Sequence, residues 1–270
     1  MKEFSVLCWN VQGVGSKRSV LPFKRAVPVL TSQNSDIICL QEMTDANEKL
    51  LNTPELNHYY KFIPKNNSLS HDHTPGFNHN VLLSKHPILN ASELIFPQFS
   101  SKNLPIENAI RAEIEIHGKI VRFYVCHFVI KKMGLLTRLK QIEYILADAI
   151  EWQGPIIICG DMNVAMPKNQ IARKIVKWWH SWPNEEMHLG AEHKKLSEKE
   201  IFHRKISDHG FTESLDLNQA TWSPLRIGLE MFKLKLDWFL VKNLQTVKAS
   251  VGGYVSDHRL INVTCQLPEK

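Results

Sequence analysis

The sequence predicts an α/β fold in which helices pack on a β-sheet. Short apolar runs such as Ile156 to Cys159 end abruptly in Gly, Asp and Asn, which is typical of strands that are buried on both faces and stop at a sheet rim. The stretch from Leu135 to Trp152 has apolar residues at helical spacing and lies between two such runs, so a right-handed strand, helix, strand crossover is expected. No shift in composition divides the 270 residues, and we expect one domain over residues 1–270.

The composition favours a globular protein with an anionic partner. Hydrophobic residues make up 43% of the chain, enough to bury an extensive core. The net charge of +6 and the pI near 9.0 favour a polyanion, because clustered Lys and Arg release counterions from phosphates. All five cysteines lie in apolar runs without CxxC spacing, which indicates buried thiols in a reducing compartment. Since the sequence shows neither a secretory signal nor a membrane span, we expect a cytoplasmic monomer without stable membrane insertion.

Two early apolar runs end at side chains that carry oxygen. Strand-like residues from Phe4 to Trp9 are followed by Asn10, and those from Asp36 to Leu40 are followed by Gln41-Glu42. An amphipathic segment from Pro22 to Leu30 separates the two runs. We interpret it as a helix interrupted at its second proline, Pro28, because proline lacks the N–H that a helix interior requires.

The region from 52 to 79 is rich in prolines and asparagines and predicts loops. It holds His71, His73 and His79, and three histidines so close together raise the possibility of a zinc site. Neither a cysteine nor a helical i, i+4 spacing accompanies them, so zinc is not the favoured interpretation.

Strands are expected again from Asn80 to Lys85, from Arg111 to Ile116 and from Ile120 to Cys126. The last two are joined by a hairpin at Gly118. The second strand of this hairpin ends at His127, which adds an imidazole to the polar residues found at the ends of apolar runs.

The part of the chain after residue 163 is harder to assign. Asn169 to Trp179 has a helical pattern, and Pro183 to Lys205 is charged and irregular, as expected for a loop with a short helix. Trp178, Trp179 and Trp182 are interpreted as packing residues, with base stacking as the alternative.

Polar residues stand at the ends of apolar runs more often than turn composition would supply. They are Asn10, Glu42, His127, Asp161, Asn163, Asp237, Asp257 and His258. The order Trp-Asn, Leu-Gln-Glu, Cys-His-Phe, Gly-Asp-Met-Asn, Thr-Trp, Leu-Asp-Trp-Phe and Ser-Asp-His-Arg runs from Trp9 to Arg259. This ordered set resembles the endonuclease/exonuclease/phosphatase superfamily, which includes deoxyribonuclease I.

The resemblance implies a fold and an activity. The fold is a four-layer α/β sandwich, in which two packed, mostly antiparallel β-sheets are flanked by helices. The activity is metal-dependent hydrolysis of a phosphodiester by in-line attack of an activated water. Mg²⁺, or Mn²⁺ in its place, would be held by Glu42 with Asn10 and Asp257, since hard cations prefer oxygen ligands.

The resemblance also implies roles for the remaining residues. Asp161 and Asn163 would orient and deprotonate the water, although which group is the base stays open. His258, paired with Asp237, would transfer a proton or contact the phosphate, and His127 would donate to the phosphate in the transition state. The expected substrate contacts are Arg111, Asn80 and Trp222, and a plain surface position is the alternative for Arg111, which opens a strand.

The tetrapeptide Ser207-Asp208-His209-Gly210 nearly repeats Ser256-Asp257-His258-Arg259. The later copy is the better match, because it follows Leu236-Asp237 and falls where the family order requires. We interpret the earlier copy as a loop before Phe211.

The resemblance leaves the substrate open, because the same scaffold cleaves nucleic acids, phospholipids and inositol phosphates. The basic charge favours a nuclease acting on DNA or RNA, and His127 argues against abasic-site incision. The segment Leu225 to Leu236 interleaves Arg226, Lys233 and Lys235 with apolar residues, as a DNA-contacting loop would, or as a half-buried edge with its lysines outward. The alternatives are a sphingomyelinase-like phospholipid hydrolase, an inositol-phosphate or phosphomonoester hydrolase, and a non-catalytic nucleic-acid-binding relative. The intact polar set argues against the last.

Overall fold

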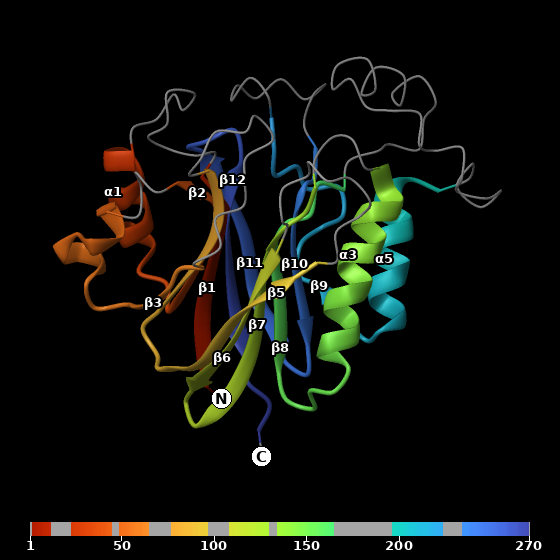
Figure 1. Cartoon of the computed structure of the whole chain (residues 1–270), viewed down its shortest axis with the longest axis horizontal. Coiled ribbons are helices and arrows are strands. Elements are labelled where there is room, and N and C mark those ends of the chain that lie inside the picture. Colours follow the sequence, from red (N-terminus) through yellow and green to blue (C-terminus); the bar gives the residue numbers. More distant parts are fainter. Residues whose placement is uncertain are drawn as a thin grey trace.

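Two six-stranded β-sheets stacked face to face form the frame of the molecule (Figure 1). The structure is a computed structural model that describes residues 2–11, 23–44, 49–64, 77–96, 108–129, 134–164, 196–223 and 234–269. Within these residues no helix is both long and apolar enough to cross a membrane.

The strands of each sheet, and then the helices, are given in chain order. The first sheet contains β1 (Glu3–Asn10), β2 (Ile37–Thr44), β3 (Tyr60–Phe62), β4 (Phe77–Ser84), β11 (Gln245–Tyr254) and β12 (Arg259–Gln266). The second contains β5 (Ile88–Ile95), β6 (Asn108–Ile116), β7 (Lys119–His127), β8 (Ile156–Asp161), β9 (Thr212–Glu213) and β10 (Asp237–Lys242). The described helices are α1 (Phe23–Gln33), α3 (Gly134–Ala149) and α5 (Glu198–Asp208), with 3₁₀ turns η1 (Lys49–Asn52) and η2 (Pro54–Leu56).

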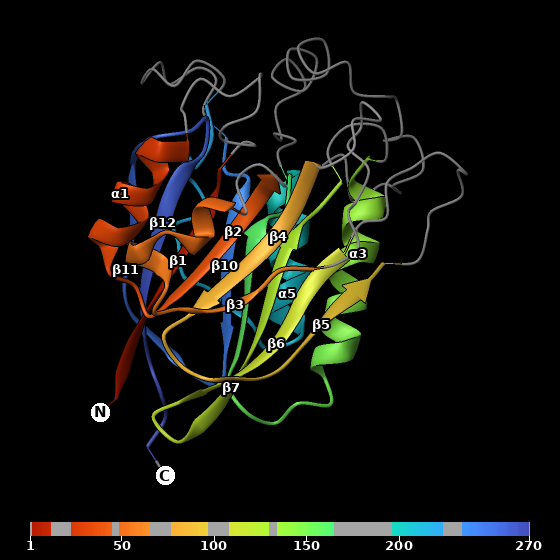
Figure 2. The same ribbon diagram turned by 60° about the vertical axis from the view of Figure 1, so that its left-hand side comes forward.

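The strand orders are β11-β12-β1-β2-β4-β3 and β5-β6-β7-β8-β10-β9. One apolar cluster fills the space between the two sheets. A second packs α1 on the outer face of the first sheet, and a third packs α3 and α5 on the outer face of the second (Figure 2). The four-layer α/β sandwich is therefore confirmed, with each layer held by the apolar face of the next.

Strand β8 shows how the sequence pattern produces this arrangement. Ile157 and Cys159 point into the core between the sheets, whereas Ile156 and Ile158 point to the helices. Each such side chain contributes about 1.5–3 kcal/mol through its burial. Strands β7 and β8 are parallel neighbours joined through α3, which confirms the predicted strand, helix, strand order.

Helix α1 differs from the prediction, because it continues through Pro28 to Gln33 without interruption. Ala26, Val27 and Leu30, on both sides of the proline, are buried against the first sheet. The packing of these side chains outweighs the one helical hydrogen bond that Pro28 cannot make.

Other expectations are met or shifted. The hairpin at Gly118 is confirmed, and Gly118 takes a φ of 79° that a turn of this kind requires. All five cysteines are buried and free, as predicted. Strand β6 begins at Asn108, so Arg111 lies inside this strand and does not open it. Strands β5 and β11 were not predicted, because their mixed exposure breaks the apolar pattern.

Candidate active site

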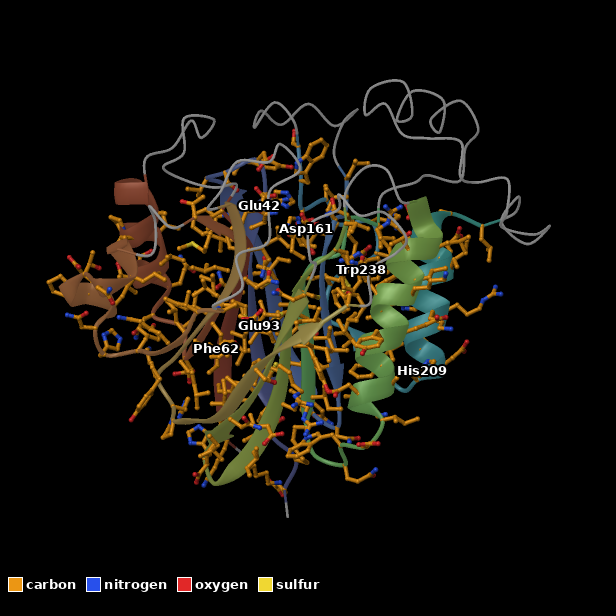
Figure 3. All side chains as sticks on the ribbon, viewed as in Figure 1. Glu42, Phe62, Glu93, Asp161, His209 and Trp238 are labelled. Atoms are coloured by element: carbon orange, nitrogen blue, oxygen red, sulfur yellow. The ribbon has the colours of Figure 1, made fainter. Side chains whose placement is uncertain are left out.

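The predicted polar residues gather at one end of the stacked sheets. Strands β1 and β2 are parallel, as are β7 and β8, so Asn10, Glu42, His127 and Asp161 emerge at the same edge. Strand β10 is antiparallel to β8 and starts there, with Asp237 opposite Asp161. Figure 3 shows Glu42 and Asp161 at this end, whereas both chain termini lie at the other end in Figure 1.

Asp161 is at the centre of the cluster. Its Oδ2 accepts a hydrogen bond from Nδ2 of Asn10 at 3.0 Å and lies 3.5 Å from Nε2 of His258 and 3.7 Å from Nε2 of His127. Its Oδ1 accepts a hydrogen bond from the backbone N–H of Asn163 at 2.9 Å. Burial raises the pKa of the Asp161 carboxyl above its usual value, although the two nearby imidazoles oppose this shift.

Glu42 faces Asp161 across the amide of Asn10. The same Nδ2 of Asn10 donates to Oε1 of Glu42 at 3.0 Å, and Nε2 of His127 lies 3.8 Å from this oxygen. This Nε2 is buried and has no hydrogen-bond partner among the residues described. A buried nitrogen near two carboxylates, without a hydrogen bond of its own, indicates a site that a further group completes.

The donor atoms fit a divalent cation. One ligand atom each from Glu42, His127 and Asp161 lie within 4.8 Å of one another, and Asp161, Asp237 and His258 form a second such group. Carboxylate oxygens suit Mg²⁺, and Mn²⁺ also accepts imidazole nitrogen. The third predicted ligand, Asp257, is in neither group, and its Oδ2 accepts a hydrogen bond from the indole of Trp222 at 3.0 Å. The first group thus adds Asp161 as a candidate ligand beside Glu42, and the assignment of Asp257 to the metal stays a prediction.

His258 and Asp237 form a buried pair. Nδ1 of His258 donates to Oδ2 of Asp237 at 2.9 Å, and the two side chains are only 5% and 1% exposed. Burial alone would lower the pKa of the imidazole, but the charges of Asp237, Asp161 and Asp257 and the hydrogen bond to Asp237 raise it well above its usual value. This environment favours the protonated form of the imidazole, whose Nε2 faces Asp161.

The backbone is unusual at three positions of the cluster. Glu42 and Asn163 have φ values of 57° and 52°, in the left-handed region that costs a non-glycine residue roughly 1–2 kcal/mol. Gly160 has a φ of 144°, and a Cβ there would lie 1.8 Å from the carbonyl oxygen of Cys126. Only glycine lets β7 and β8 approach so closely just before His127 and Asp161.

The expected substrate contacts lie in three different places. Asn80 is buried, donates through Nδ2 to a backbone carbonyl of β6 at 3.1 Å, and has an Oδ1 without a hydrogen-bond partner in the described part of the chain. Trp222 is half-buried and forms a β-bridge with His258. Arg111 is not brought to the cluster, because its Nη1 pairs with Oδ1 of Asp148 on α3 at 2.9 Å.

The earlier Ser-Asp-His copy ends a helix and is not the predicted loop. Ser207 and Asp208 are in the last turn of α5, and His209 follows as its cap, with Nδ1 donating to the carbonyl of Lys205 at 2.9 Å. The prediction was wrong for Ser207 and Asp208, because the helix that starts at the capping box of Ser197 continues to Asp208, whereas His209 and Gly210 form a turn before Phe211. Figure 3 shows His209 well away from Glu42 and Asp161.

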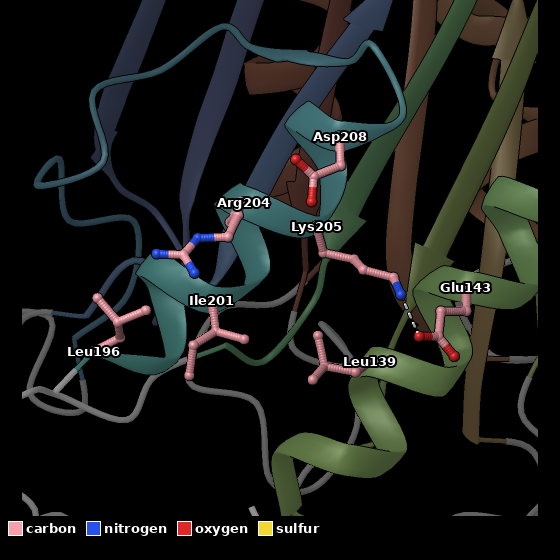
Figure 4. A pocket seen from close by; sticks show the side chains of 7 residues that line it. All are labelled: Leu139, Glu143, Leu196, Ile201, Arg204, Lys205 and Asp208. Atoms are coloured by element: carbon pink, nitrogen blue, oxygen red, sulfur yellow. Dashed lines mark hydrogen bonds and ion pairs between the residues drawn. The ribbon is translucent and has the colours of Figure 1, made fainter. Parts of the chain in front are cut away.

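A pocket of about 180 Å³ lies between α3 and α5 (Figure 4). An ion pair between Lys205 and Glu143 spans it. None of the predicted site residues lines this pocket, so it is separate from the candidate active site. The lining residues are Leu139, Glu143, Leu196, Ile201, Arg204, Lys205 and Asp208.

Several expectations fall outside the described residues. They concern the histidines His71 and His73, the side chain of His79, the tryptophans Trp178, Trp179 and Trp182, the helix over 169–179, and the segment from Leu225 to Lys233. Lys235, from the end of that segment, is described. Its side chain is buried, with 3% exposed, so both predictions for this residue, a DNA contact and an outward-pointing lysine, are wrong.

Sequence reasoning gave no role to Thr221 and Glu213, and it placed Lys235 in a DNA-contacting loop or on an outward edge. Thr221, Lys235 and Glu213 contact the backbone beside Asp237 through their side chains. Lys235, inside the apolar run before Asp237, was the available signal, because a buried charge requires a partner.

Comparisons with known proteins identify the fold and the family. No curated protein matches the chain. An endonuclease/exonuclease/phosphatase from Beutenbergia cavernae is 14% identical, with a TM-score of 0.73 over 99% of this chain and 72% of that one. One from Bacteroides vulgatus is 13% identical, with a TM-score of 0.72 over 99% and 100%. TDP2 of D. rerio, complexed with a single strand DNA product, is 16% identical, with a TM-score of 0.66 over 98% and 100%. Since the sequence profile of the family matches residues 7–258, the chain belongs to the Endonuclease/Exonuclease/phosphatase family.

Proposed function

We propose that this chain is a divalent-metal-dependent phosphodiesterase that cleaves DNA or RNA. Members of its family are hydrolases acting on phosphoester bonds. The observation that carries the proposal is the contact set of Asp161, which meets the amide of Asn10 and faces the imidazoles of His127 and His258. A carboxylate that can accept a proton and imidazoles that can donate one, together at one buried point, are groups that phosphoester hydrolysis uses.

The cation belongs beside Glu42, with Asn10 next to it. When bound, Mg²⁺ or Mn²⁺ supplies positive charge that neutralises a phosphoryl oxygen. Asp161, positioned by Asn163, accepts a proton from water as the water oxygen forms its bond to phosphorus.

His258 supplies the second proton transfer of the reaction. Its Nε2 donates a proton to the leaving oxygen as the P–O bond breaks. Asp237 keeps the imidazole protonated and oriented, and His127 donates a hydrogen bond to the charged phosphate.

Nucleic acid is the proposed substrate class for two reasons. The net charge of +6 and the pI near 9.0 favour association with a polyanion. In addition, the structurally similar TDP2 of D. rerio was solved with a single strand DNA product.

The test is a hydrolysis panel with Mg²⁺, Mn²⁺ or excess EDTA over plasmid DNA, single-stranded RNA, sphingomyelin and inositol phosphates. Wild-type protein is compared with Asp161→Ala and with Asp208→Ala, which removes an exposed carboxylate from the earlier tripeptide. We expect hydrolysis of DNA or RNA that EDTA abolishes, a kcat lowered roughly 10²- to 10⁴-fold in Asp161→Ala, and no loss in Asp208→Ala.

Two results would contradict the proposal. Full activity in a folded Asp161→Ala variant would show that Asp161 is not the proton acceptor. Turnover of sphingomyelin or inositol phosphates, with none of DNA or RNA, would replace nucleic acid by a lipid or phosphomonoester substrate.

A further inference from the structure

A buried ion pair lies directly behind Asp237. Nζ of Lys235 is 3.4 Å from Oε1 of Glu213, and the two side chains are 1% and 2% exposed. Taking two charges out of water costs several kcal/mol for each, and well-packed apolar residues in their place are often as stable or more so. The stability of the fold therefore does not by itself explain this pair.

The pair lies where β10 lacks a strand on one edge. Strand β8 pairs along the whole of β10 and places Asp161 opposite Asp237. On the other edge β9 pairs only with Leu240 and Val241, and the N–H of Ser214 beside it reaches the carbonyl of Phe239 at 2.9 Å. The described register leaves the N–H of Phe239 and the backbone groups of Asp237 without strand partners there. Buried backbone groups require other partners in such a position.

Side chains take the place of the missing strand. Nζ of Lys235 donates to the carbonyl of Asp237 at 3.3 Å, and both carboxylate oxygens of Glu213 lie 3.4 Å from the N–H of Phe239. Thr221 completes the set, since its Oγ1 accepts the N–H of Asp237 at 3.0 Å. The ion pair thus holds β10 on both sides of Trp238, whose ring centre is 4.9 Å from the ammonium.

The orientation of the Asp237 carboxylate depends on this backbone. Its Oδ2 accepts the hydrogen bond from His258, whereas its Oδ1 is buried and has no hydrogen-bond partner among the described residues. A carboxylate held by one side-chain bond follows its own Cα. A shift of β10 would therefore move the carboxylate relative to the imidazole.

We propose that Lys235 and Glu213 are positioning residues, which fix the backbone of Asp237 so that its carboxylate meets Nδ1 of His258. The effect on rate rests on the proposed hydrolase function, whereas the effect on the imidazole follows from the contacts alone. Glu213 balances the charge of Lys235, so removing both charges together leaves the net charge near Asp237 unchanged. The main effect of the double substitution is therefore on the position of Asp237.

The test uses the double variant Glu213→Gln with Lys235→Met, which leaves no buried charge unpaired. The matched control is Arg138→Met with Glu198→Gln, which removes another buried ion pair, between α3 and α5, with side chains 2% and 1% exposed. In metal-free protein we expect the downfield Nδ1 proton resonance of His258 to shift or broaden in the double variant and to stay in place in the control.

Kinetics provide the second readout, with bis(p-nitrophenyl) phosphate as the substrate and Mg²⁺ present. We expect the double variant to lower kcat roughly ten- to a hundredfold, as for a small misplacement of a catalytic group, and to leave KM within about twofold. The control should retain the wild-type kcat.

An unmoved His258 resonance in a folded double variant would overturn the positioning role, as would a wild-type kcat in an enzyme that hydrolyses the probe. A shifted resonance in a protein that hydrolyses nothing would support positioning and reject the proposed function. If the double variant does not fold, Glu213→Asp keeps the charge and shortens the reach to Phe239. The His258 resonance should then move in the same direction by less, and its staying in place would overturn the proposal.

Discussion

The chain contains the tripeptide Ser-Asp-His twice, and the two copies differ in their secondary structure, burial and contacts. In the first, His209 caps α5 and its Nδ1 donates to the backbone of Lys205 in the same helix. In the second, His258 is buried, with Asp237 at 2.9 Å and Asp161 at 3.5 Å. The histidine of the first copy finds its hydrogen-bond partner within its own helix, whereas the histidine of the second copy contacts side chains from distant strands.

The serines of the two copies show the same difference. Ser207 is exposed at the end of α5. Ser256 is buried, accepts a hydrogen bond from the indole of Trp9 at 3.2 Å and donates to the carbonyl of Asn10 at 2.8 Å. Long-range contacts surround His258, whereas the same tripeptide without such contacts only ends a helix.

The largest expected difference between the copies is in catalysis. We expect His258→Ala to lower kcat roughly 10²- to 10⁴-fold with the fold retained, because it removes a general acid. His209→Ala should keep kcat within about twofold. Steady-state hydrolysis of bis(p-nitrophenyl) phosphate with Mg²⁺ measures both, and an equal loss in the two variants would show that the contacts of His258 have no special role.

A smaller difference concerns protonation. Because the folded-state pKa of His258 is raised, its contribution to stability is complete below its unfolded pKa of about 6.5 and is lost as pH rises through the folded pKa. In metal-free protein followed by NMR, His258 should therefore stay protonated above neutral pH. Asp237→Asn should lower that pKa, each unit being worth about 1.4 kcal/mol, and Asp208→Asn should not. An unchanged His258 titration in Asp237→Asn would contradict the assignment of its charge to this carboxylate.

The smallest effect is expected from the helix that carries the first copy. Ser197 caps α5 and accepts the N–H of Glu200 at 3.2 Å. We expect Ser197→Ala to lower the free energy of unfolding by about 1 kcal/mol, as urea denaturation would measure. The kcat should not change, and a loss of activity would mean that α5 influences the active site after all.

The fold and most of the cluster were predictable because the residue pattern of a buried strand is visible in the local sequence. The apolar run before Asp161 and the polar residues at strand ends are visible in the sequence, and β-pairing then brings them together. Pro28 misled because packing of α1 on the sheet outweighs local propensity. The partner of Arg111 could not be read from the sequence, since Asp148 lies on a helix 37 residues away. The same holds for Glu213 and Lys235, because nothing local shows where β9 stops.

The hydrogen bond from Ser256 to Asn10 has a consequence for the order in which the polar cluster can assemble. It joins residues 246 positions apart, and Asn10 reaches Asp161 across 151 positions. During synthesis on a ribosome, the first half of the cluster would wait, incomplete, until His258 had emerged and β12 had paired with β1. Contacts so distant form late in folding, because a long loop must close before they add stability. A growing chain therefore lacks the His258 side of the cluster, and with it the activity proposed above.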